Sequence, residues 1–148
     1  MTDSKDTLLT VEAVHEAQAA WGAAVVAQDV DTLAALYDFE VLLFKPTMAA
    51  DIRVDEAGAR SYFVGGDARY PGDQGFLNHA FVGVEFESAR GVMLEGGGHS
   101  AQDMGHYYFH EADGGVIKAD YSFSYHRCDG RVRITLHHSS FNVGTSSS

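Results

Sequence analysis

Four polar side chains in a row, residues 137–140, interrupt the last apolar run of the chain, "RVRITLHHSS". Successive side chains of a β-strand point to opposite faces, so one face is predicted to carry Val132, Ile134, Leu136, His138 and Ser140. The first three are typical core residues, so we expect His138 and Ser140 to lie inside the fold as well. A histidine and a hydroxyl group at the polar end of a buried face can hold a small molecule and transfer a proton.

The same pattern has two other interpretations. A buried His-x-Ser pair can simply bind backbone groups where a strand ends, as most buried polar side chains do. The strand pattern alone therefore leaves a functional pocket and a purely structural strand end equally open. A β-bulge earlier in the strand would also exchange the two faces, and His137 and Ser139 would then point inward.

The sequence contains no recognisable metal-binding motif. It has eight histidines but one cysteine, with neither a helical H-x-x-x-H pair nor a Cys/His quartet at zinc spacing. His137 and His138 point to opposite faces, whereas His106 and His110 could share one side of a strand. We therefore predict no metal ligands. Cys128 cannot form an internal disulfide and, beside a turn, is expected to be inert.

Composition limits the class of protein. The chain has 148 residues, of which 45% are hydrophobic, and this predicts a single domain over 1–148, with a folded core over roughly 8–142 and a disordered tail at 143–148. The charge balance of 10 − 21 = −11 argues against nucleic acid or an anionic membrane surface as partner. Neither a spanning helix nor a signal peptide is visible, so we expect a cytoplasmic protein.

The spacing of apolar residues along the sequence predicts the helices and strands that position these side chains. A first helix, capped by Thr10, is predicted from the stripe Val11, Val14, Ala17, Trp21 and Val25. Asp31 is predicted to cap a short second helix, and Asp55 a third that ends at Gly65-Gly66. One strand is expected over residues 39–46. Beyond residue 75 the period is two, and strands are expected over 80–88, 92–98, 105–112, 116–127 and 131–140, with a tight turn at Asp129-Gly130. Helices followed by strands indicate an α+β fold, with helices covering one face of a curved antiparallel sheet.

Five motifs occur in order: "VLLFKPT", "ARSYFVGG", "DQGF", "MGHYYF" and "LHHSS". Together they resemble the iota-class carbonic anhydrases over roughly residues 10–141. That class is similar to the association domain of calcium/calmodulin-dependent protein kinase II, within the nuclear transport factor 2-like (SnoaL-like) superfamily. The resemblance implies a cystatin-like cone, in which a curved antiparallel sheet wraps around N-terminal helices, and assembly as a homodimer. It also implies reversible hydration of CO2 to bicarbonate and a proton.

The resemblance further implies a set of site residues. Thr47, Tyr62, His138 and Ser140 match the family's catalytic positions, and the hydroxyl groups of Thr47, Tyr62 and Ser140 would bind the substrate. Arg60, His137 and Ser139 are further substrate-binding candidates, although an arginine can equally form a surface ion pair. No cofactor is expected, and a metal-dependent variant remains open.

Two rival functions use the same fold. The first is a non-enzymatic association or ligand-binding module, since a fold by itself does not determine activity. The second is another SnoaL-like enzyme, an isomerase or cyclase, which would need a roomier cavity with an Asp or His base deep inside. The small polar set of Thr, Tyr, His and Ser favours the carbonic anhydrase over this second rival.

Overall fold

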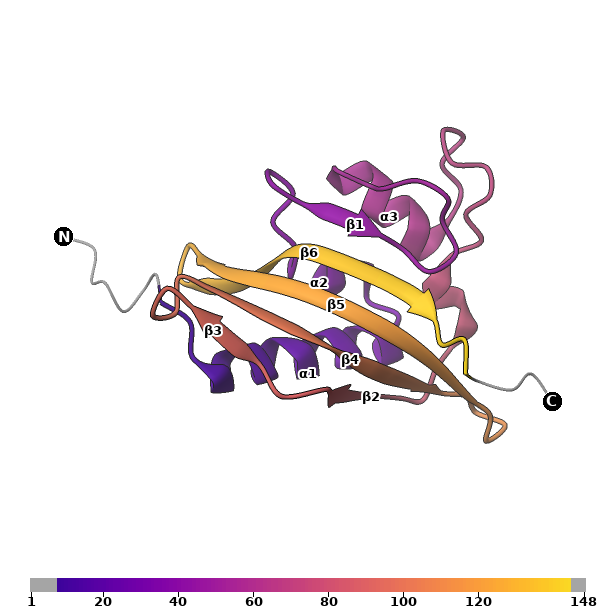
Figure 1. Ribbon diagram of the computed structural model, residues 1–148. Helices are drawn as coiled ribbons and strands as arrows, with labels where there is room; N and C mark the ends of the chain where they lie inside the picture. Colours follow the sequence, from indigo (N-terminus) through magenta and orange to yellow (C-terminus); the bar gives the residue numbers. More distant parts are fainter. Residues whose placement is uncertain (1–7, 145–148) are drawn as a thin grey trace.

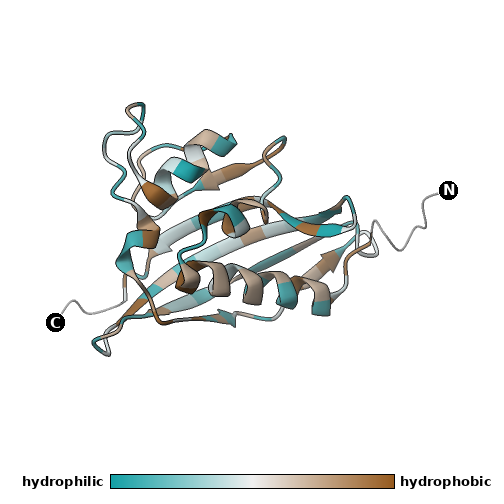
Figure 2. Cartoon of the chain, turned by 180° about the vertical axis from the view of Figure 1, so that it is seen from behind, coloured by the Kyte–Doolittle hydropathy of each residue, from teal (hydrophilic) through white to brown (hydrophobic). Residues whose placement is uncertain are grey.

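Helix α1 (Val11–Ala27) lies along the inner face of a curved sheet, as the views from the two sides show (Figures 1 and 2). The computed structural model describes residues 8–144, so residues 145–148 of the predicted tail lie outside it. Thr10 caps the helix as predicted, because its hydroxyl oxygen accepts a hydrogen bond from Ala13 N at 3.1 Å. Val14, Trp21 and Val25 of the predicted stripe are buried against the sheet.

Two shorter helices follow. Helix α2 (Val30–Ala34) is capped by Asp29, whose carboxylate accepts a hydrogen bond from Thr32 N at 3.1 Å, so the prediction of Asp31 as the cap was wrong. The helix begins before Asp31, and a capping side chain must precede the first helical residue. Helix α3 (Glu56–Val64) begins after Asp55 and ends at Gly65, as predicted.

Within the described residues, six strands form one mixed sheet in the order β1-β6-β5-β4-β2, with β3 also paired to β4. The strands are β1 (Leu43–Lys45), β2 (Gly83–Ser88), β3 (Met93–Glu95), β4 (Ser100–His110), β5 (Val116–Cys128) and β6 (Arg131–Phe141). The α+β class and the curved sheet are confirmed. The sheet is not wholly antiparallel, however, because β1 pairs with β6 in parallel.

A β-bulge in β6 decides which side chains face inward. Ser124 of β5 lies opposite Leu136, but the next residue, Tyr125, lies opposite Ile134, so Thr135 is an extra residue in β6. One inserted residue exchanges the two faces of the strand beyond it. His137 and Ser139 therefore lie inside the fold.

The same bulge places His138 and Ser140 on the exposed outer face. The prediction that these two residues line the interior was wrong for this reason. The alternative prediction, in which a bulge turns His137 and Ser139 inward, describes the strand correctly.

Aromatic side chains fill the space between α1 and the sheet. The Trp21 ring stacks on Tyr107 with the centroids 5.7 Å apart and meets the edges of Phe86, Phe109 and Phe123. This packing makes a rigid wall for any cavity beside it.

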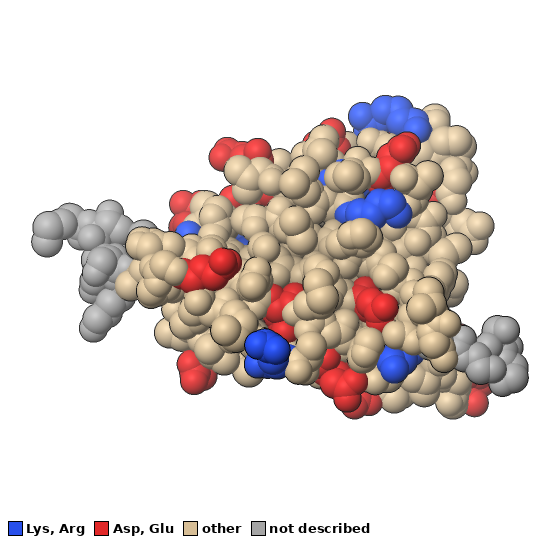
Figure 3. Space-filling view, viewed as in Figure 1, with Lys and Arg blue, Asp and Glu red and all other residues tan. Residues whose placement is uncertain are grey.

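Charges are scattered over the surface. On the face shown in Figure 3, acidic and basic side chains are interspersed, with neither sign gathered into a large patch. No helix within residues 8–144 is both long and apolar enough to cross a bilayer.

Candidate active site

His137 lies at the centre of the polar interior. It pairs in register with Phe44 of β1, and its ring is stacked between Phe44 and Phe123, with centroid distances of 4.8 and 4.1 Å. The residue is only 2% exposed, and its burial, assisted by the neighbouring His138, lowers the pKa of His137 to about 3. His137 is therefore a neutral imidazole near pH 7, and in this resting state it is a poor proton acceptor.

A chain of hydrogen bonds runs through this imidazole. Trp21 Nε1 donates to Tyr37 Oη at 3.0 Å, and Tyr37 Oη lies 2.9 Å from His137 Nδ1. On the other side of the ring, His137 Nε2 lies 3.2 Å from Tyr107 Oη, and Tyr107 donates to Ser139 Oγ. Ser139 Oγ is in turn 2.5 Å from Thr47 Oγ1.

The donor and the acceptor of every hydrogen bond in this series follow from Trp21, its first residue. The indole N–H is a donor only, so Tyr37 Oη accepts from it, and Tyr37 must give its own proton to His137 Nδ1, its other partner among residues 8–144. A neutral imidazole that accepts at Nδ1 carries its proton on Nε2 and donates it to Tyr107. Ser139 accepts a hydrogen bond from Tyr107 and donates one to Thr47, whose own hydroxyl group lies beside that of Tyr62 at the cavity.

Two neighbouring cavities, which share lining residues, adjoin Thr47, the last residue of this hydrogen-bonded series. The inner one has a volume of about 20 Å³, room for about one water molecule. Its polar lining consists of Thr47, Tyr62, Tyr107, His137 and Ser139; its apolar lining is formed by Trp21, Phe44, Pro46, Phe63, Phe76 and Phe109. The outer cavity, of about 210 Å³, shares Thr47, Tyr62, Phe76 and Phe109 with it. These four side chains therefore stand at the boundary between the two spaces.

Tyr62 comes from helix α3 and faces both cavities. Burial raises the pKa of its hydroxyl group, an effect partly offset by interactions with the Met48 backbone and the Thr47 hydroxyl. Burial likewise raises the pKa of Tyr107. Both phenols are therefore protonated hydrogen-bond donors at neutral pH, and the inner cavity has no charged side chain in its lining.

An ion pair fixes the loop that covers the outer cavity. Arg53 donates to both oxygens of Asp73, each at 2.8 Å, and Ser61 Oγ donates to Asp73 Oδ2 at 2.6 Å. The Arg53 guanidinium also lies 3.9 Å from the centre of the Tyr70 ring. Asp73 opens the "DQGF" motif, so this anchor places Gln74 and Phe76 at the rim of the cavity.

The predicted site residues divide into two groups. Thr47 and Tyr62 lie in the inner cavity, together with His137 and Ser139. His138 and Ser140 do not, because of the bulge. Arg60 does not line either cavity: it pairs with Glu56 and Asp31 at 2.7 Å each on the surface, the alternative that the sequence left open for an arginine.

Sequence reasoning missed the relay between α1 and the hydroxyl groups. Trp21 was assigned to the core alone, and neither Tyr37 nor Tyr107 was considered as a polar partner. The available signal was the residue type, because a buried Tyr or Trp needs a partner for its O–H or N–H. Among residues 8–144, the group of three metal-ligating side chains that the structure brings together lies elsewhere, on the outer face, and consists of Asp38, His126 and Cys128.

The arrangement of these elements is shared with proteins of known family. Residues 6–141 match the family model described as metal-independent carbonic anhydrase. The chain belongs to this family. The metal-independent carbonic anhydrase of Nostoc sp. strain PCC 7120 is 32% identical over 139 residues, which are 91% of this chain and 66% of the relative. The chain thus spans slightly less than two thirds of that relative's length.

Solved structures agree with the family assignment. The crystal structure of a cyanobacterial iota-carbonic anhydrase complexed with bicarbonate has a TM-score of 0.82 and 31% identity, covering 91% of this chain and 93% of the other. A putative calcium/calmodulin-dependent protein kinase II association domain from Xanthomonas campestris has a TM-score of 0.63 at 23% identity, covering 89% of this chain and 87% of the other, and shows the fold alone. Other matches are described as NTF2-like and cystatin-like, so the predicted fold family is confirmed.

Proposed function

We propose that this member of the family catalyses the reversible hydration of CO2 to bicarbonate and a proton, without a metal ion. The observation that carries the proposal is the inner cavity of about 20 Å³, whose polar lining consists of hydroxyl groups and one neutral imidazole. Membership of the metal-independent carbonic anhydrase family and the bicarbonate complex of a relative support the same reaction.

The two cavities suit both CO2 and bicarbonate, the substrates of the forward and reverse reactions. The outer cavity is lined by Phe76, Phe81, Phe109 and Ile117, and this apolar passage favours entry of neutral CO2. The hydroxyl groups of Thr47 and Tyr62, which line both cavities, then hold the water molecule and the CO2 oxygens in attack geometry where the two spaces meet. The same groups can donate to bicarbonate in the reverse direction.

The proton is moved by a hydroxyl group rather than by a charged base. As the water oxygen bonds to the CO2 carbon, water gives one proton to Thr47 Oγ1, and Thr47 gives its own hydroxyl proton to a CO2 oxygen. The sum is CO2 + H2O → H2CO3, so every atom in the cavity stays uncharged. Carbonic acid leaves through the outer cavity and loses its proton to solvent or buffer.

His137 acts in this scheme as a positioning residue. Its neutral ring transmits the direction set by Trp21, so that Tyr107 donates to Ser139 and Ser139 donates to Thr47 at the cavity. Donors aligned in one direction stabilise the negative charge that develops on the CO2 oxygens in the transition state.

We also propose that the protein is a cytoplasmic homodimer. Leu43, Ile52 and Val54 are each more than half exposed, and the bridge between Phe44 and Arg53 places them on one side of the β1 edge. An exposed apolar patch of this kind is typical of an interface. The unpaired Cys128 is consistent with a reducing compartment. Light scattering during gel filtration, on wild type and Leu43→Asp, tests the dimer.

The deciding experiment is stopped-flow measurement of CO2 hydration on chelator-treated protein whose metal content has been assayed. Hydration that persists with far less than one metal per chain is expected. Activity that disappears on chelation and returns with one ion would overturn the metal-free mechanism. A folded protein that is inactive with and without added ions would instead favour the association module.

A further inference from the structure

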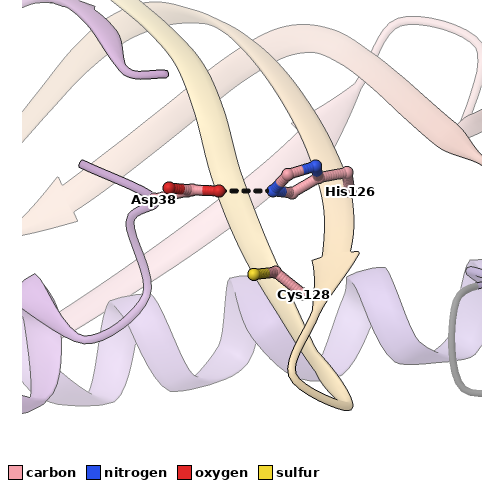
Figure 4. Close-up of side chains that lie close together, drawn as sticks. All are labelled: Asp38, His126 and Cys128. Atoms are coloured by element: carbon pink, nitrogen blue, oxygen red, sulfur yellow. Dashed lines mark hydrogen bonds and ion pairs between the residues drawn. The ribbon is translucent and has the colours of Figure 1, made fainter. Parts of the chain in front are cut away.

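Three metal-ligating side chains converge on the outer face of the sheet, where the proposed reaction has no use for them (Figure 4). His126 and Cys128 are two residues apart at the end of β5 and therefore project from the same face. Asp38 follows α2 and reaches across β6, and its carboxylate Oδ2 lies 2.7 Å from His126 Nε2. The three ligand atoms all lie within 4.8 Å of one another.

The backbone around these side chains is held firmly. Asp38 N donates to Ile134 O at 2.9 Å, which ties the Asp38 segment to the edge of β6. Cys128 directly precedes the tight turn in which Asp129 and Gly130 have φ values of 54° and 74°. The three side chains therefore start from backbone positions that already keep their ligand atoms within 4.8 Å of one another.

Comparison with the other histidines on this face separates the cluster from an ordinary ion pair. His106 pairs with Asp120 at 2.7 Å, and His110 pairs with Glu85, but neither pair belongs to a three-ligand group within residues 8–144. The Asp38 side chain is also only 12% exposed, against 38% for Asp120 and 69% for Glu85. His126 thus has a better shielded carboxylate partner and a thiol nearby.

We propose that Asp38, His126 and Cys128 bind one divalent ion of the zinc class, at a site separate from the reaction cavity. One nitrogen, one oxygen and one sulfur donor suit Zn²⁺ or Co²⁺ and exclude the hard ions Mg²⁺ and Ca²⁺, which need oxygen ligands. Three protein ligands leave a fourth tetrahedral position for water.

Charged side chains surround the cluster. Asp129 follows Cys128 in the turn, and its carboxylate Oδ2 lies 3.8 Å from Cys128 Sγ. Arg133 lies beside His126 in the register, and its guanidinium donates to Ala35 O at 2.6 Å.

The test is titration of the metal-free protein with Co²⁺, followed by absorption. One equivalent should produce a thiolate-to-cobalt charge-transfer band, and one equivalent of Zn²⁺ should abolish it. Cys128→Ser should remove the band and weaken Co²⁺ binding, measured by calorimetry, at least tenfold; His126→Gln should weaken it similarly. His106→Gln is the matched control, because it removes a His–Asp pair from the same face, and it should bind like wild type.

Two results would overturn the inference. One is the absence of stoichiometric binding by the wild-type protein. The other is binding that Cys128→Ser and His126→Gln leave unchanged while circular dichroism shows all variants folded. CO2 hydration is measured on the same samples and should be equal with and without the ion. An ion required for hydration would overturn the separation of the two sites and the metal-free proposal together.

Discussion

The two faces of the sheet place histidine in opposite environments. On the inner face, His137 is stacked between aromatic rings, and its ring nitrogens bond to the hydroxyl groups of Tyr37 and Tyr107. On the outer face, His106, His110 and His126 each pair with a carboxylate. The inner imidazole is therefore kept neutral. It accepts a hydrogen bond from Tyr37 and donates one to Tyr107. The outer ones each lie against an acidic side chain near solvent.

Acid should destabilise the protein through the inner histidine, and this is the largest effect we expect. The folded pKa of His137 is about 3, below its ordinary value of 6.5, so the unfolded chain binds the proton more readily. The stabilising contribution is complete above pH 6.5 and is lost as the pH falls toward 3. Urea unfolding of wild type should show a loss of several kcal/mol over this window that His137→Gln does not share.

His138→Gln is the control for that measurement. Its side chain lies on the outer face and only adds to the lowering of the His137 pKa that burial causes, so the variant should keep most of the wild-type pH dependence of the unfolding free energy. An equal change of slope in both variants would contradict the assignment of His137 to the interior.

Removal of one hydroxyl group on each face is the sharpest test of the bulge. Ser139→Ala should lower kcat/KM for CO2 hydration by about 100-fold, the usual cost of one lost oxyanion donor, because Thr47 loses the hydrogen bond that orients its own hydroxyl group. Ser140→Ala, one residue further along and exposed, should remain close to wild type in stopped flow. If Ser140→Ala lowers the activity and Ser139→Ala does not, Ser140 faces inward and β6 has no bulge at Thr135.

Tyr62→Phe should lower kcat/KM by roughly tenfold, the effect of losing one neutral hydrogen bond. The ring still packs against Phe76, with centroids 5.9 Å apart, while the donor at the boundary of the two cavities is lost. Tyr108→Phe, which removes an exposed phenol that donates to Glu87 on the outer face, serves as the matched control and should leave hydration unchanged. Equal activity in both variants would exclude Tyr62 from the site.

Trp21→Phe should have the smallest effect, a severalfold decrease in kcat with little change in KM. The substitution removes the N–H that directs the chain, so Tyr37 and His137 become free to reverse their bonds. The imidazole signals in an NMR spectrum should then report a change of His137 tautomer. An unchanged tautomer combined with reduced kcat would show that Trp21 acts through packing alone.

Local chemistry predicted much of this molecule. Thr10 and Asp55 cap helices, and Asp129-Gly130 forms the tight turn, because each uses a property of one or two neighbouring residues. The resemblance correctly indicated that Thr47 and Tyr62 lie together, and both line the inner cavity.

The errors arose where distant segments determine the geometry. Nothing in the residue types of "RITLHH" marks Thr135 as an extra residue, because the bulge is defined by its pairing with β5. Asp38 and His126 are 88 positions apart, so their contact cannot be predicted from spacing. The hydrogen-bond partner of Trp21 could not be predicted for the same reason, because Tyr37 lies outside α1, in the segment that follows α2.

The parallel pairing of β1 with β6 also determines when the cavity can exist during folding. Thr47 and Ser139 are separated by 92 positions, and they meet only when β1 docks on a strand from the opposite end of the chain. The long intervening loop must be closed, at an entropic cost, before any of these contacts forms. The β4–β5 and β5–β6 hairpins can assemble from near neighbours well before that event. We therefore expect the cavity to form late in folding. During refolding, the proposed hydration activity should recover with the docking of β1 on β6 rather than with the formation of secondary structure.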